Sequence, residues 1–131
     1  MYHSYELDLG NAKLTFQAID KLEREVSIDI SIVADFMMIQ MKEIWFYRQN
    51  IAKFIESLHA YLDNHYAFSS IDNKEFSLEI DKINERQINI KINFIKYGLS
   101  KKSQNLNILI ITVMDYQKIE DFLIYLKIFS I

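Results

Sequence analysis

The sequence lacks cysteine and proline altogether and has only two glycines among its 131 residues. Without cysteine, no disulfide framework, thiolate metal site or cysteine nucleophile can form. Two glycines are too few for a glycine-rich phosphate loop, and no G-x-S-x-G nucleophile elbow is present. The composition therefore excludes thiol chemistry and disfavours the commonest nucleotide cofactors.

Long apolar runs and an excess of positive charge are missing as well. The longest apolar stretch, Leu106 to Met114, has the length of a strand, against the ~20 residues that span a bilayer. The 15 lysines and arginines face 18 acidic residues, whereas nucleic-acid binders show a basic footprint. Lys96, Lys101 and Lys102 are interpreted as a solvated loop, and no secretory signal opens the chain. We expect a cytoplasmic protein that binds neither nucleic acid nor membrane.

What is present is enough for one real hydrophobic core. Half of the residues are hydrophobic and 14% are aromatic, so a single domain over residues 1–131 is expected. Apolar and polar residues alternate with a period of two over most of the chain, which predicts strands with one wet face. Residues 36–47 and 106–114 are apolar on both faces, which predicts central strands or strands covered twice.

Two segments have the three- and four-residue apolar spacing of a helix. The first runs from about Arg48 to Asn64, and the second, from Ile119 to Phe129, follows Asp115 as a helix cap. A shift of 68 residues places the stripe of the first helix on that of the second. The stripes consist of Ile51, Phe54, Ile55 and Leu58, with Leu62 beyond them, and of Ile119, Phe122, Leu123 and Leu126.

Together these patterns predict an α+β fold with an antiparallel sheet of about six to seven strands and two helices packed on one face. The halves 1–66 and 73–131 would each be a β-meander followed by a helix. Duplication and convergence both remain open as origins of this repeat.

Candidate chemistry is sparse. His59 and Asp63 lie four apart and could share a metal, but no further ligands accompany them, and we expect no metal site. Asp29 with Glu79 or Asp81 could act as acid and base, but these carboxylates alternate with core positions. They are explained more simply as the wet face of strands. We therefore expect neither an enzyme nor a cofactor.

The same carboxylates are candidates for contact with a protein partner. Asp29, Glu79 and Asp81 on the wet face, with Trp45 and Tyr47 nearby in the sequence, form the predicted partner-binding set. The core is the favoured location of the segment from Trp45 to Tyr47, and an interface anchor is the alternative for the tryptophan.

The last helix is apolar nearly all round, since Ile124, Tyr125 and Ile128 occupy the faces beside its stripe. Such a helix must be buried against something. Either it lies deep in the domain, or its tail pairs as a strand, or these three residues form a subunit interface of a homodimer.

The order of elements is similar to that of a known family. A helix at residues 50–58 precedes two paired strands, from Phe76 to Asp81 and from Arg86 to Phe94. An apolar strand from Leu106 to Met114 and a closing helix from Ile119 to Phe129 follow. This order resembles the WapI-type immunity proteins of bacterial contact-dependent toxin systems. The resemblance implies a cytoplasmic, non-catalytic protein that binds a cognate toxin domain.

A different class of function remains open beside it. The chain could be a homodimeric protein that binds a small apolar ligand between sheet and helices. Side chains such as Met37, Met41 and Phe122 would line the pocket.

Overall fold

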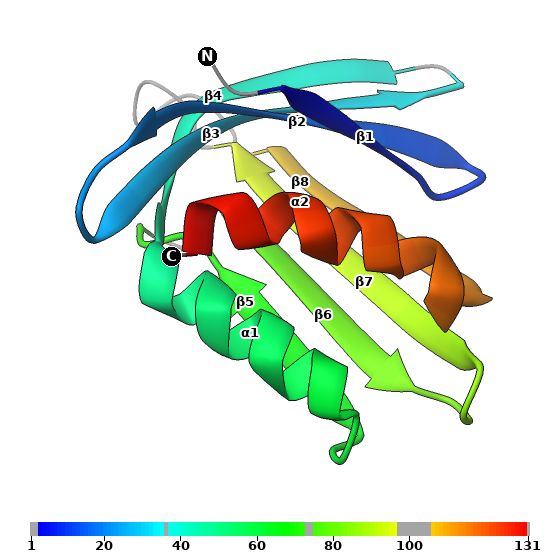
Figure 1. The fold of residues 1–131 in the computed structure, drawn as a ribbon. Helices are drawn as coiled ribbons and strands as arrows, with labels where there is room; N and C mark the ends of the chain where they lie inside the picture. Colours follow the sequence, from blue (N-terminus) through cyan, green and yellow to red (C-terminus); the bar gives the residue numbers. More distant parts are fainter. Residues whose placement is uncertain (1–2, 36, 73–74, 97–105, 131) are drawn as a thin grey trace.

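A computed structural model describes residues 3–35, 37–72, 75–96 and 106–130, which form two four-stranded antiparallel sheets and two α-helices (Figure 1). Sheet A consists of β1 (Ser4–Asp8), β2 (Ala12–Lys21), β3 (Glu25–Ala34) and β4 (Met37–Tyr47). Sheet B consists of β5 (His65–Ser69), β6 (Phe76–Lys82), β7 (Gln87–Lys96) and β8 (Leu106–Asp115). The helical segments are α1 (Arg48–Ala60) after β4, and the 3₁₀ turn η1 (Tyr116–Ile119) with α2 (Glu120–Ser130) after β8.

The α+β class with antiparallel strands is confirmed, but the single sheet of six to seven strands is wrong. The chain builds two sheets of four strands each, in the orders β1-β2-β3-β4 and β5-β6-β7-β8. Alternation along a strand tells which residues share a face, but not which strand lies beside it. The short strand β5 also escaped prediction, because its five residues follow the first helix after a brief turn.

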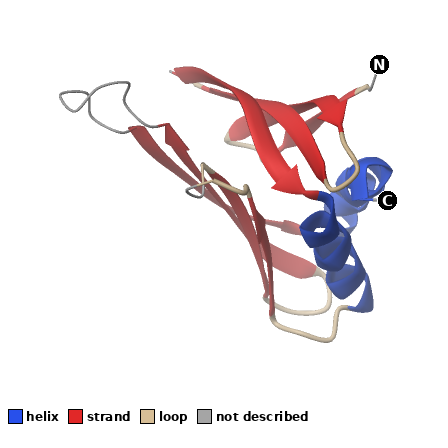
Figure 2. Cartoon of the chain, turned by 90° about the vertical axis from the view of Figure 1, so that its left-hand side faces the viewer, coloured by secondary structure: helices blue, strands red, loops and turns tan. Residues whose placement is uncertain are grey.

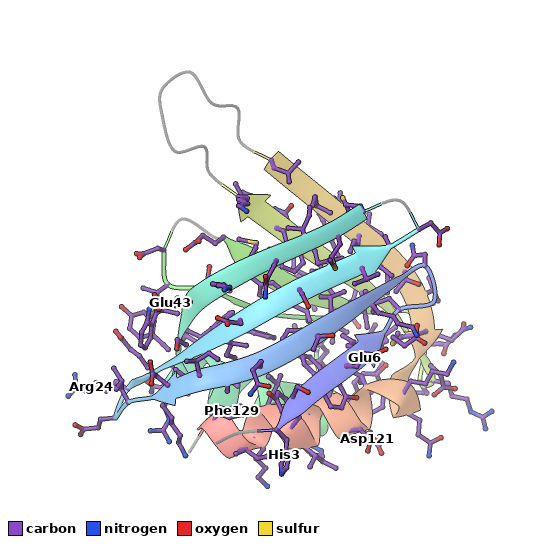
Figure 3. All side chains as sticks on the ribbon, turned by 90° about the horizontal axis from the view of Figure 1, so that it is seen from above. His3, Glu6, Arg24, Glu43, Asp121 and Phe129 are labelled. Carbon is purple, nitrogen blue, oxygen red and sulfur yellow. The ribbon has the colours of Figure 1, made fainter. Side chains whose placement is uncertain are left out.

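The helices fill the space between the sheets rather than covering one face of a single sheet. Figure 2 shows the two sheets opening toward the helices like a wedge, with the helices on the open side. Figure 3, which looks down on sheet A, shows β8 crossing beneath it at a steep angle. Aromatic rings from both sheets meet in the middle: Phe76 of β6 contacts Phe16 of β2 and Phe46 of β4. The two inner sheet faces and the helices therefore share one core.

The first helix ends earlier than its apolar spacing predicts. It stops at Ala60, and Tyr61 adopts the left-handed conformation with φ of 54°, its amide donating to the Ser57 carbonyl. Leu62 continues the spacing in the sequence but lies beyond the helix and is 88% exposed. The second helix begins as predicted behind Asp115, whose carboxylate accepts a hydrogen bond of 2.9 Å from the Gln117 amide.

The prediction that residues 36–47 and 106–114 form central or doubly covered strands is wrong. β4 and β8 are both edge strands of their sheets. In β4 a bulge opposite Asp29 shifts the register, so Met41 and Ile44 both face the core. An extra residue reverses the inside and outside of every position beyond it. β4 therefore has a single apolar face, whose residues stand at odd positions of the sequence before the bulge and at even positions after it.

Each half of the chain consists of a four-stranded meander followed by a helix, and the halves share a junction. The Arg48 amide donates to the Arg24 carbonyl at 2.9 Å, and the Tyr116 amide donates to the Arg86 carbonyl at 2.7 Å. In both cases the residue after the last strand is tied to the turn between the second and third strands. The four stripe positions of each helix are buried. Whether a duplication produced this correspondence stays a hypothesis.

None of the helices in the part of the chain that the structure describes is long and apolar enough to cross a membrane.

Candidate functional site on the outer sheet faces

The five residues predicted to contact a partner lie on two different surfaces. Asp29, Trp45 and Tyr47 lie on the outer face of sheet A, because they alternate with the core residues of β3 and β4. Glu79 and Asp81 lie on the outer face of sheet B, on β6. The structure thus brings together the two β6 carboxylates but does not join them to the other three.

Asp29 has a structural role in sheet A. Its Oδ1 accepts a hydrogen bond of 2.8 Å from the amide of Glu43, which has φ of 55° at the β4 bulge. A non-glycine residue in the left-handed region is disfavoured, and this hydrogen bond helps to hold it. Figure 3 shows Glu43 along β4 on the face of sheet A turned to the viewer.

We expect Asp29→Ala to lower the free energy of unfolding by about 1 kcal/mol, because the Glu43 amide loses its acceptor. The matched variant Asp81→Ala removes only an exposed ion pair with His65 and should cost about 0.5 kcal/mol or less. Urea denaturation of both variants measures the difference. Equal losses would show that Asp29 does not support the bulge.

The outer face of sheet B has four parallel columns of different chemistry. On β6, Asp81 accepts a hydrogen bond of 2.8 Å from Nδ1 of His65 on β5. Glu79 lies 3.8 Å from Nε2 of the same histidine and 3.8 Å from Nζ of Lys91 on β7. The fourth column, on β8, has a run of three aliphatic residues between Asn107 and Asp115. Its outward residues Leu109, Ile111 and Val113 are 52%, 52% and 56% exposed.

The segment from Trp45 to Tyr47 divides between core and surface. Phe46 is buried between the sheets, whereas Trp45 is half-buried on the outer face and Tyr47 is exposed. Tyr47 lines a surface depression of about 570 Å³ at the start of α1, together with Arg24 and Arg48. The core prediction for all three residues is therefore correct only for Phe46.

The predicted subunit interface on the last helix divides in the same way. Tyr125 is buried and stacks on Tyr5, and its single hydroxyl proton is shared between the carbonyls of His3 at 2.9 Å and Phe16 at 3.2 Å. It belongs to the core and is not available to a second subunit. Ile124 and Ile128 are 66% and 53% exposed on the outer side of α2. The tail remains helical through Ser130 rather than pairing as a strand.

Candidate metal and ligand residues are also placed apart. Asp63 lies beyond the end of α1, so the four-residue spacing to His59 no longer aligns the two side chains. Within the described ranges, no group of three histidine or acidic side chains could hold a metal ion. Met41 lines an open depression of about 440 Å³ between β4 and sheet B. Phe122 instead packs on the rings of Tyr5 and Phe16.

Burial raises the pKa of several groups outside these columns. It raises the pKa of the Glu75 carboxyl, and the neighbouring Asp72 carboxylate adds to the rise. Burial is also the main cause of the raised pKa of Tyr116 and Tyr125. Both phenols donate hydrogen bonds to main-chain carbonyls. These tyrosines have structural roles.

Lys101 and Lys102, predicted to lie in a solvated loop, fall outside the described residues, while Lys96 ends β7 and is exposed.

Comparison with protein families, with curated proteins and with solved structures finds no match to this chain.

Sequence reasoning identified Glu79 and Asp81 but missed their surroundings. His65 and Lys91 were not expected beside them, because the pairing of β5 with β6 and of β6 with β7 was unknown. The aliphatic column of β8 was seen as a second apolar face, but it was expected to be covered. A signal was available, since β8 immediately precedes the final helix and could therefore lie at the end of a meander.

Proposed function

We propose that this chain is a non-enzymatic protein-binding module of the cytoplasm, and that its partner is a toxin domain which it inhibits. The observation that carries the proposal is the outer face of sheet B, where an exposed aliphatic column lies beside columns of polar and charged side chains. Protein interfaces commonly combine an apolar centre with a polar rim, and exposed apolar patches of this kind mark interaction sites. The resemblance in element order to WapI-type immunity proteins supports the choice of partner.

The charges on this face determine which kind of partner surface would complement it. Glu79 and Asp81 lie in one column with Ser77 on β6. Lys91 on the neighbouring strand β7 forms an ion pair with Glu79. The chain as a whole has a net charge of −3. A partner with basic side chains facing β6 and an apolar patch facing β8 would complement this face.

Capture from the producing bacterium tests the proposal. The immobilised chain should retain one protein in stoichiometric amount, and co-expression of this chain should suppress the toxicity of the captured protein. A toxin gene immediately upstream of the gene for this chain would identify the protein to express. Recovery of no protein partner, together with turnover of a small metabolite by the purified chain, would overturn the proposal. An apolar molecule that co-purifies with the chain would instead favour a ligand-binding protein.

A further inference from the structure

The four edges of the two sheets that the structure describes differ in how they are protected against pairing with another strand. β1 and β5 are short, with five residues each. α2 packs on β1 through the Tyr5 ring, and α1 packs on β5 through the Phe54 and Phe68 rings. β4 is interrupted by the bulge at Glu43. Short strands, bulges and covering helices are the devices by which proteins prevent pairing between sheet edges.

β8 has none of these devices among its described residues. It is ten residues long and pairs with β7 in one continuous register. From Leu106 to Met114 it contains no charged residue, no proline and no glycine. Segments with high strand propensity and no charge pair readily with identical segments. β4 is the corresponding strand in the first half of the chain, directly before α1. The bulge at Glu43 interrupts its edge.

We propose that two copies of this chain associate through the edges of β8, which pair antiparallel about a twofold axis at Leu109. The β1–β2 turn reaches β8 at Thr112, whose Oγ1 donates to the Leu9 carbonyl at 3.2 Å. Pairing therefore uses residues 107–111, which an axis at Leu109 pairs with one another. With the twofold axis at Leu109, the outward side chains of both β8 strands lie on the same face of the joined sheet. Leu109 then faces Leu109 of the second copy, and Asn107 faces Ile111 of the second copy.

The second copy is the occupant that charge complementarity favours. An uncharged strand is complemented by another uncharged strand, and this arrangement places no like charges opposite each other. Among the described strands β8 is the one unprotected edge of each chain. An isologous pairing therefore uses the β8 edges of both copies and closes as a dimer. It also joins the aliphatic columns of the two copies at the centre of one continuous outer face.

The paired segment is short, which sets the strength of the association. Five residues a side bury less than the about 800 Å² per partner that stable complexes bury. We therefore expect a reversible dimer with a dissociation constant on the order of 10 μM. This inference does not depend on the identity of the toxin or on the function proposed above.

Sedimentation velocity from about 1 to about 300 μM tests the dimer. Wild type should shift from monomer to dimer. Leu109→Lys and Leu109→Glu should each raise the dissociation constant at least about tenfold, because two like charges meet at the axis. An equimolar mixture of these two variants should dimerise again. Val113→Lys, an equally exposed position on the same face outside the paired segment, should leave the constant unchanged.

Several results would overturn the proposal. These are a wild type that stays monomeric over the whole range, a mixture that does not recover, and assemblies that grow beyond a dimer. Loss of association in Ile124→Lys but not in Leu109→Lys would move the interface to α2. Hydrogen exchange of the wild type gives an independent readout if the Leu109 variants do not fold. Backbone amides within residues 107–111 should then exchange more slowly at high concentration, and exchange that is independent of concentration would contradict the dimer.

Discussion

Phe76→Ala should lower the free energy of unfolding by about 3–5 kcal/mol, the largest loss we expect from a single substitution. The Phe76 ring is fully buried and contacts rings from both sheets. Its centroid lies 6.1 Å from that of Phe16 and 5.7 Å from that of Phe46 in sheet A, and 5.0 Å from that of Phe94 in sheet B. Truncation leaves a cavity between the sheets that neither sheet can close alone.

Urea denaturation with linear extrapolation measures this loss. Tyr47→Ala is the matched control, because it removes an aromatic ring of similar size from the exposed end of β4 and should change stability by about 0.5 kcal/mol or less. A loss for Phe76→Ala that is no larger than that of the control would show that the two sheets do not share one core.

Arg48→Met should lower the free energy of unfolding by about 2–4 kcal/mol, because its guanidinium joins three main-chain carbonyls. Nε donates to the Phe129 carbonyl at the end of α2, and Nη1 donates to the Leu22 and Glu23 carbonyls in the β2–β3 turn, all at 2.9 Å. The methionine retains most of the apolar stem but none of the donors. One side chain thus ties the start of α1 to the end of α2 and to sheet A.

Thermal or urea unfolding of two further variants separates this role from general charge effects. Arg24→Met removes an exposed arginine from the same turn, which Figure 3 shows at the tip between β2 and β3, and it should have little effect. Arg48→Lys should give an intermediate loss, because one ammonium cannot reproduce the planar fork of donors. Equal stability of Arg48→Met and Arg24→Met would contradict the bridging role.

The elements were predictable to the extent that their pattern is local. Val26, Ile28, Ile30 and Ile32 share a face that is buried as predicted. The helix stripes were also correct at the positions from Ile51 to Leu58 and from Ile119 to Leu126. The pairing of strands was not predictable, since each meander could have extended the other into one sheet. The bulge at Glu43 escaped because it depends on a side chain of the neighbouring strand, Asp29.

The candidate site was predictable only in part, for the same reason. Glu79 and Asp81 could be placed on a wet face from their own strand. That Asp29 lies on the other sheet, and that Tyr125 donates to main-chain carbonyls in the core, follows from tertiary contacts between distant residues. A helix that is apolar all round indicates burial, but its sequence does not tell which of its faces stays exposed.

Recognition through the outer face of sheet B is the central claim, and titration of the captured partner tests it most directly. The affinity of wild type is compared by calorimetry with that of Glu79→Gln/Asp81→Asn, which neutralises the β6 carboxylates. A second double variant, Glu23→Gln/Glu56→Gln, changes the net charge equally at exposed positions of the β2–β3 turn and α1. We expect the β6 variant to bind at least about tenfold more weakly, a loss of about 1.4 kcal/mol, and the other variant to bind like wild type. Equal affinities for the two double variants would contradict the claim.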